Sequence, residues 1–229
     1  SYFDDFNDPK QLKAWKQLIE DMAIHLEKRY GKNEVRSWYF ETWNEPNLDI
    51  FWTFGLQGLL NYYDACSEGL READPQLVFG GPGTAGAPDN ETFKKLLEHC
   101  DSGTNYFTGE KGIRIDFISY HIKARARFMV QNELEVADYI KNNHPRFMTL
   151  PLINNEADPI AGWGRKFFWR PGPWYASFVV NSIDLHNKYI IDQKDVNYEL
   201  LSNDNGFMGD FYRRTHFARF MENNRSEER

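Results

Sequence analysis

The sequence predicts an α/β protein, and specifically the last five β/α units of a (β/α)8 TIM barrel. Short apolar runs alternate with amphipathic helical segments along the chain, which is typical of a parallel sheet covered by helices. Each of the five predicted strands ends in polar or glycine-rich sequence, as expected for the active face of a barrel. The first predicted element is a helix with no strand before it, so we expect the earlier barrel strands to precede this chain. A small open sheet is the alternative.

The elements of the first half follow from their caps and apolar spacing. Asp8 is placed to cap a helix that has Pro9 at its first position, and Gly31 is placed to end it. Its apolar stripe consists of Leu12, Trp15, Ile19, Met22, Ala23 and Leu26. The next predicted elements are a strand at 35–42, a helix at 56–73, a strand at 77–80 and a helix that begins near 89–91.

The second half continues the same alternation. Its predicted elements are strands at 115–121, 150–154 and 199–202, with helices near 132–141, within 174–189 and at 213–223. No low-complexity linker or composition shift marks a domain boundary. We therefore expect residues 1–229 to form a single partial catalytic domain, approximately strands 4 to 8 of the barrel, with no second domain.

Composition excludes several classes of protein. The 229 residues are 41% hydrophobic and 27% charged, and no apolar run is long enough to span a membrane. The net charge of −7 provides no basic majority, so nucleic-acid binding is not expected. Two cysteines cannot make a disulfide scaffold at this size, and Cys66 and Cys100 are expected to be buried and free. Two N-glycosylation sequons, at Asn90 and Asn224, favour a secretory route if they are not chance triplets.

Two glutamates at strand ends carry the functional prediction. Glu45 follows an apolar-aromatic run and precedes Pro46, which cannot continue a strand because it has no backbone donor. Glu156 follows the apolar run at 150–154 in a similar context. Glycoside hydrolysis requires one carboxyl group as proton donor and a second as nucleophile or base. A surface ion-pair role remains the alternative for Glu45, and Asp158 remains an alternative to Glu156.

Several motifs resemble one known family. They are Phe40–Pro46, Leu60–Leu70, Asn155–Pro159, Gly162-Trp163 and Leu200–Asn205. Together they resemble the iduronidase branch of glycoside hydrolase family 39, over essentially the whole chain. That resemblance implies a (β/α)8 catalytic domain, a retaining mechanism and a lysosomal or secretory location.

The resemblance also implies residue roles. Glu45 matches the general acid/base and Glu156 matches the nucleophile of a double displacement. The matching substrate-binding positions are Asn44, His121, Lys123, Gly162, Trp163, Asp204 and Arg214. No metal and no cofactor is implied. The implied partner is a glycosaminoglycan, with non-reducing terminal α-L-iduronate cleaved from dermatan or heparan sulfate.

Some alternatives stay open at this level. The family also contains β-xylosidases, which share both glutamates. An alternative outside the enzymes is that the chain is a truncated, non-catalytic carbohydrate-binding protein. His121 can equally be a satisfied strand-end histidine, and Arg214 a helix-surface arginine. The run at 123–127 either extends recognition to sulfate groups or is a solvated basic loop. The loop at 47–50 departs from the family pattern, which puts its substrate contacts in doubt.

Overall fold

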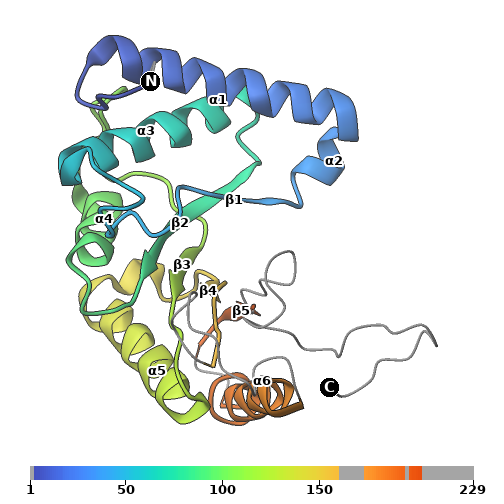
Figure 1. The fold of residues 1–229 in the computed structure, drawn as a ribbon. Helices are drawn as coiled ribbons and strands as arrows, with labels where there is room; N and C mark the ends of the chain where they lie inside the picture. Colours follow the sequence, from blue (N-terminus) through green and yellow to red (C-terminus); the bar gives the residue numbers. More distant parts are fainter. Residues whose placement is uncertain (1–2, 160–172, 194–195, 203–229) are drawn as a thin grey trace.

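The protein is a curved, five-stranded parallel sheet with helices on its convex side (Figure 1). This computed structural model describes residues 3–159, 173–193 and 196–202. The strands are β1 (Tyr39–Glu41), β2 (Val78–Ala85), β3 (Ile118–His121), β4 (Leu152–Asn154) and β5 (Tyr198–Leu201). The helices are α1 (Pro9–Tyr30), α2 (Lys32–Val35), α3 (Gly55–Ala73), α4 (Glu91–Ser102), α5 (Ala126–Asn143) and α6 (Pro173–His186), with a 3-10 turn at Pro145–Phe147 and a π-helical turn at Asn187–Ile191.

The strands pair in chain order, and every pairing is parallel. β1 pairs with β2 from Tyr39 opposite Val78, and β3 pairs with β4 from Ile118 opposite Leu152. The pairing between β2 and β3 and that between β4 and β5 are also parallel. All five carboxyl ends therefore lie along one edge, where loops from distant parts of the sequence meet.

The first helix forms as its caps predict. The Asp8 side chain accepts a hydrogen bond from the Lys10 amide, and Gly31 ends α1 with φ of 93°, a backbone conformation that favours glycine. α1 then packs along α3. A Cβ at Gly69 of α3 would lie 2.5 Å from the Lys16 carbonyl oxygen, so glycine allows the two helices to approach.

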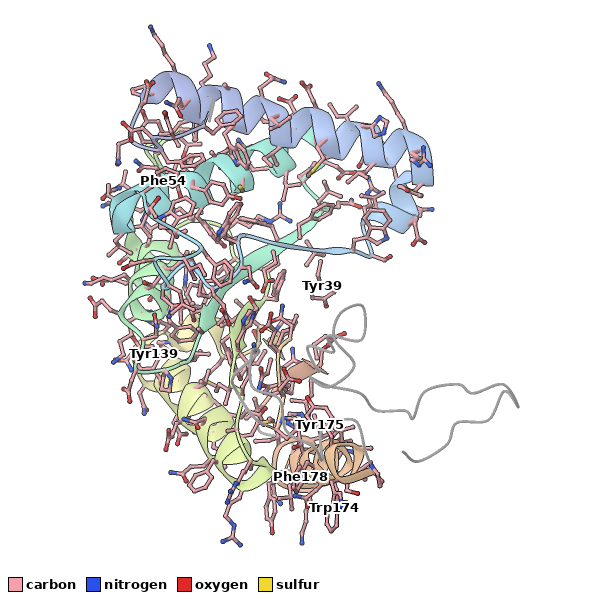
Figure 2. All side chains as sticks on the ribbon, in the orientation of Figure 1. Tyr39, Phe54, Tyr139, Trp174, Tyr175 and Phe178 are labelled. Carbon is pink, nitrogen blue, oxygen red and sulfur yellow. The ribbon has the colours of Figure 1, made fainter. Side chains whose placement is uncertain are left out.

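The hydrophobic core fills the space between the sheet and its helices. Tyr63 of α3 packs against Phe79 of β2 with ring centroids 4.8 Å apart and ring planes tilted by 40°, and both side chains are buried. On α6, Tyr175 is buried, whereas Trp174 and Phe178 are exposed (Figure 2). Tyr39 projects from β1 on the concave side of the sheet, away from α1 and α3 (Figure 2).

The five predicted strands are confirmed, but several boundaries were wrong. The first strand does not include Val35, because Gly31 ends α1 and the chain turns into α2 before β1 begins. β2 runs on to Ala85, beyond the predicted glycine at 80. α5 begins at Ala126, six residues before the predicted start. The predicted helix at 213–223 lies outside the described residues.

Two further expectations concern the cysteines and membrane-spanning helices. Cys66 and Cys100 are buried and free, as predicted. Within the described ranges, no helix combines the length and apolar character that a membrane-spanning segment needs.

Candidate active site

Glu45 is held in an uncommon backbone conformation at the carboxyl end of β1. Its φ is 46°, the only positive value for a non-glycine residue among those described, and such a conformation costs of order 1–3 kcal/mol. Hydrogen bonds hold it on both sides. The Glu45 amide donates to the Gly83 carbonyl at 2.8 Å, and the Leu48 amide donates to the Glu45 carbonyl at 3.0 Å. These two bonds hold the Glu45 backbone in the conformation from which its side chain extends.

Glycine at position 83 permits this arrangement. Gly83 has φ of 62°, and a Cβ there would lie 2.6 Å from the Trp43 carbonyl oxygen. The Gly83 amide donates to the Ser119 hydroxyl at 3.1 Å, which ties the end of β2 to β3. Glycine at position 83 therefore allows β2 to approach the Trp43 backbone, two residues before Glu45.

Glu156, the second glutamate, lies two residues after the end of β4. The preceding residue, Asn155, donates through its side-chain amide to both carboxylate oxygens of Glu41, at 3.0 and 3.1 Å. The following residue, Ala157, donates its amide to the Ser202 carbonyl at 2.6 Å. Contacts to the ends of β1 and β5 therefore hold the segment that carries Glu156.

His121 and Lys123 lie between the two glutamates. His121 Nδ1 is 2.9 Å from Glu45 Oε1 and 3.4 Å from Glu156 Oε2. Lys123 Nζ makes a close ion pair with Glu156 Oε2 and lies 4.0 Å from Glu45 Oε1. One cationic and one ionisable side chain from the end of β3 thus offset the repulsion between two neighbouring carboxylates.

Glu45, His121 and Glu156 are residue types that can bind a metal ion. The Lys123 ammonium, however, already provides the positive charge next to the two carboxylates. One ligating atom from each of Glu45, His121 and Glu156 lies within 4.8 Å of the others. The Lys123 ammonium already faces both carboxylates. A divalent cation in the same space would meet that positive charge at close range, which opposes binding.

A buried polar network supports the end of β3 from behind. The Asn154 side chain accepts from the Ile122 amide at 3.0 Å and donates to the Ile122 carbonyl at 3.2 Å. Asn154 also contacts Glu133 of α5, which is fully buried. Glu133 in turn contacts His186 Nδ1 at 2.8 Å and accepts a hydrogen bond from Tyr198 at 3.2 Å.

The structure brings together four of the residues that the sequence singles out: Glu45, His121, Lys123 and Glu156. Asn44, directly before Glu45, is exposed to solvent. Asp158, the alternative to Glu156, is fully buried and accepts a hydrogen bond from Tyr175 at 2.9 Å. Four predicted substrate-binding residues lie outside the described residues: Gly162, Trp163, Asp204 and Arg214.

Other predictions concern the surface. Asn90 is half-buried and caps α4, its Oδ1 accepting from the Phe93 amide at 3.1 Å, so glycosylation there stays a prediction. Asn224 lies outside the described residues. In the basic run, Arg125 and Arg127 are exposed, whereas Lys123 belongs to the carboxylate cluster.

Three supporting residues were missed by the sequence reasoning. They are Glu41, Asn155 and Asn154, which hold the segments carrying the glutamates and the end of β3. Alternation along the strand could have identified Glu41, because it lies two residues after Tyr39 on the same face of β1. The long-range partners of the two asparagines have no comparable signal in the sequence.

Comparisons with known proteins point in one direction. A model of the glycosyl hydrolases family 39 matches residues 1–226. The chain is 42% identical to α-L-iduronidase of Mus musculus over 235 residues, which cover 97% of this chain and 37% of that protein. It is 41% identical to a β-xylosidase of Caldicellulosiruptor saccharolyticus over 114 residues, covering 49% of this chain and 21% of the xylosidase.

A solved structure gives the same picture for the fold. A bacterial orthologue of human α-L-iduronidase superposes with a TM-score of 0.88 at 39% identity, over 94% of this chain and 37% of that one. The five parallel strands and their helices are thus part of a (β/α)8 barrel. The chain spans a little over a third of the length of these two relatives.

Proposed function

Because the chain belongs to glycosyl hydrolases family 39, we propose that it carries the two catalytic glutamates of a retaining α-L-iduronidase. The observation that carries this proposal is the paired geometry of Glu45 and Glu156. Their nearest ligating atoms lie within 4.8 Å, with His121 contacting both. Carboxyl groups about 5–5.5 Å apart suit a retaining enzyme, whereas an inverting enzyme needs a wider gap for water.

The proposed reaction proceeds in two displacements. Glu156 attacks the anomeric carbon, while Glu45 gives its proton to the glycosidic oxygen and the leaving alcohol departs. Glu45, now a carboxylate, then takes a proton from water as that water attacks the same carbon and releases Glu156. Both steps invert the carbon, so the product keeps the configuration of the substrate. Lys123, in contact with Glu156, supplies the positive charge that balances the nucleophile.

The proposed substrate is non-reducing terminal α-L-iduronate of dermatan or heparan sulfate. Lys123 is a cation within the site, and Arg214, Gly162, Trp163 and Asp204 are proposed to add donors and polar contacts to the sugar. Asn44 is proposed to hydrogen-bond a sugar hydroxyl next to the reacting carbon. A lysosomal or secretory location, with N-glycans at Asn90 and Asn224, belongs to the same proposal.

A β-xylosidase-like activity is the second candidate, because a β-xylosidase relative also matches this chain. A xyloside has no carboxylate, so a cation at Lys123 would have less to bind in the sugar. The non-catalytic carbohydrate-binding alternative is less well supported, since both glutamates are present and face one cluster.

Hydrolysis of a fluorogenic α-L-iduronide at acidic pH, by the full-length gene product, tests the proposal. We expect activity on the iduronide, little on the matched β-xyloside, and loss of iduronide hydrolysis in Glu156→Ala. Glu135→Ala, which removes an exposed glutamate of α5, is the matched control and should retain activity. Preference for the xyloside would support the second candidate, and no hydrolysis of either would support a binding protein.

A further inference from the structure

The side chain of Asn154 holds the backbone between two residues of the site. Asn154 is the last residue of β4 and is fully buried. Its Oδ1 accepts from the Ile122 amide at 3.0 Å, and its Nδ2 donates to the Ile122 carbonyl at 3.2 Å. Ile122 stands between His121 and Lys123, which both contact the glutamates. We propose that Asn154 is a positioning residue for hydrolysis, with its amide oriented by Glu133 of α5, and this inference rests on the proposed function.

This contact begins where the backbone ladder between the two strands ends. The register of β3 on β4 ends with Tyr120 opposite Asn154. Ile122 lies two residues further on and is buried, so its backbone groups need partners within the protein. The Asn154 side chain supplies both of them. Because alternate side chains of an extended backbone share a face, holding Ile122 in this way directs His121 and Lys123 to the same side.

The same residue links the two halves of the ion pair at the nucleophile. Asn154 lies two residues before Glu156, and Ile122 lies directly before Lys123. One side chain thus ties the backbone that carries the nucleophile to the backbone that carries its cationic partner. Misplacement of a reacting group by about 1 Å can reduce a rate about a hundredfold, so this link is expected to affect turnover.

Glu133 determines which way the Asn154 amide faces. The two ends of an amide are alike in shape, but only the nitrogen donates, and a carboxylate only accepts. Glu133 Oε1 lies 3.4 Å from Asn154 Nδ2 and accepts from the Tyr198 hydroxyl at 3.2 Å, while Oε2 lies 2.8 Å from His186 Nδ1. In the reversed orientation, the Asn154 oxygen would face the Glu133 carboxylate with no hydrogen between them, where neither side chain reaches solvent.

The test measures the pH dependence of fluorogenic iduronide hydrolysis by two variants of the full-length gene product. Glu133→Gln replaces a group that only accepts with one that also donates, so the Asn154 amide can reverse. Asn154→Ser is smaller and too short to reach both backbone groups of Ile122, so it tests the same link from the other side.

We expect kcat to fall at least about tenfold in each variant. The acidic limb of the kcat/KM profile, which reports ionisation of the nucleophile, should also move up by about one pH unit, because a neighbouring cation favours the ionised form. A loss of stability alone would not move that limb.

Asp64→Asn is the matched control, because it alters a buried carboxylate of the same kind. Asp64 of α3 is 1% exposed, lies 2.9 Å from His99 Nε2 and accepts from the Tyr106 amide at 2.8 Å. The control should lower the urea midpoint of unfolding and leave kcat and the acidic limb unchanged.

Two results would overturn the positioning role alone. One is an unchanged kcat and acidic limb in the folded Glu133→Gln and Asn154→Ser proteins. The other is an equal loss of kcat in Asp64→Asn, which would make the effect one of general stability. Hydrolysis of neither the iduronide nor the matched xyloside by the unaltered protein would overturn the proposed function, and the positioning role with it.

Discussion

Lys123 illustrates how one side chain can serve two carboxylates. Its ammonium pairs closely with Glu156 and lies 4.0 Å from Glu45, and its side chain is only 14% exposed. Charge pairs that are partly removed from water interact more strongly than pairs on an open surface. The sequence assigned Lys123 to substrate binding, and the contacts add a role in holding the two glutamates at short range.

At the scale of single residues, replacement of Lys123 should therefore reduce turnover. We expect Lys123→Met to lower kcat on the aryl iduronide about a hundredfold, as for loss of one preorganised electrostatic contact. Lys141→Met, an exposed lysine of α5, is the control and should be neutral. Steady-state kinetics on both variants make the measurement, and a kcat for Lys123→Met within about threefold of the unaltered protein would contradict this role.

The two glutamates could be predicted from the sequence because the signal for each is local. Glu45 precedes a proline at a strand end, and Glu156 follows an apolar run. Their supporting contacts could not, since the bond from Asn155 to Glu41 joins residues 114 positions apart. Such partners depend on the order and register of the strands, which a single sequence does not specify.

Among the helices, α5 carries a buried charge whose partners come from other elements. Glu133 contacts Asn154 of β4, His186 of α6 and Tyr198 of β5. Removing one member leaves the others buried without their partner, which typically costs more than the pair contributes. The helix was predicted to begin at residue 132, and the periodicity gave no sign that a glutamate on it would face inward.

Glu133→Ala should consequently destabilise the fold. We expect the free energy of unfolding to fall by about 3 kcal/mol, measured by urea titration of the full-length gene product. Glu135→Ala, two residues away and exposed, should change it by less than about 0.5 kcal/mol. Equal effects of the two substitutions would show that the buried network does not stabilise α5.

The contact between α1 and α3 gives a second test at this scale. A Cβ at Gly69 would meet the Lys16 carbonyl at 2.5 Å and Ile19 Cβ at 3.0 Å, so Gly69→Ala should cost about 2 kcal/mol through overpacking. At Gly58 of the same helix the nearest atom is Phe54 Cβ at 3.2 Å. Gly58→Ala should therefore cost less than about 1 kcal/mol, and thermal unfolding of both variants compares them. A larger loss at Gly58 would contradict the account.

Over the whole molecule, buried aromatic and thiol groups set the response to alkaline pH. Burial raises the pKa of the Cys66 thiol to about 12, and burial also raises the pKa values of Tyr62, Tyr63, Tyr120 and Tyr198. The unfolded chain loses these protons near pH 8.5 for a thiol and near pH 10 for a phenol, whereas the folded protein keeps them. Unfolding then releases protons, so stability falls as pH rises above about 8.5.

The melting temperature should accordingly decrease between pH 8 and pH 10.5. In the folded protein, the absorbance of ionised tyrosine should appear slowly over the same range, because the buried tyrosines keep their protons. Calorimetry across that range, with absorbance near 295 nm, makes the measurement. A melting temperature that stays constant to pH 10.5, or rapid ionisation of all tyrosines in the folded protein, would contradict the burial of these groups.

The whole-molecule pattern was the most predictable feature. Alternating helices and apolar runs indicated a parallel sheet, because each crossover between parallel strands needs a covering helix. The curvature and the inner face were not predictable in the same way. A hollow of about 360 Å³ lies on that face, and its lining comes from different strands and the segments next to them: Tyr39, Glu41, Phe117, Ile153, Asn155 and Glu199. The order of the strands in the sheet brings these residues together.

The most direct test of the central claim is covalent trapping of the nucleophile. A fluorinated α-L-iduronyl fluoride reacts through its good leaving group, and the ring fluorine slows hydrolysis, so the glycosyl-enzyme accumulates. Peptide mass spectrometry of the full-length gene product should then place the added sugar on Glu156, with no label in Glu156→Ala. A sugar on Glu45 or on another residue, or no label at all, would contradict the assignment of Glu156 as nucleophile.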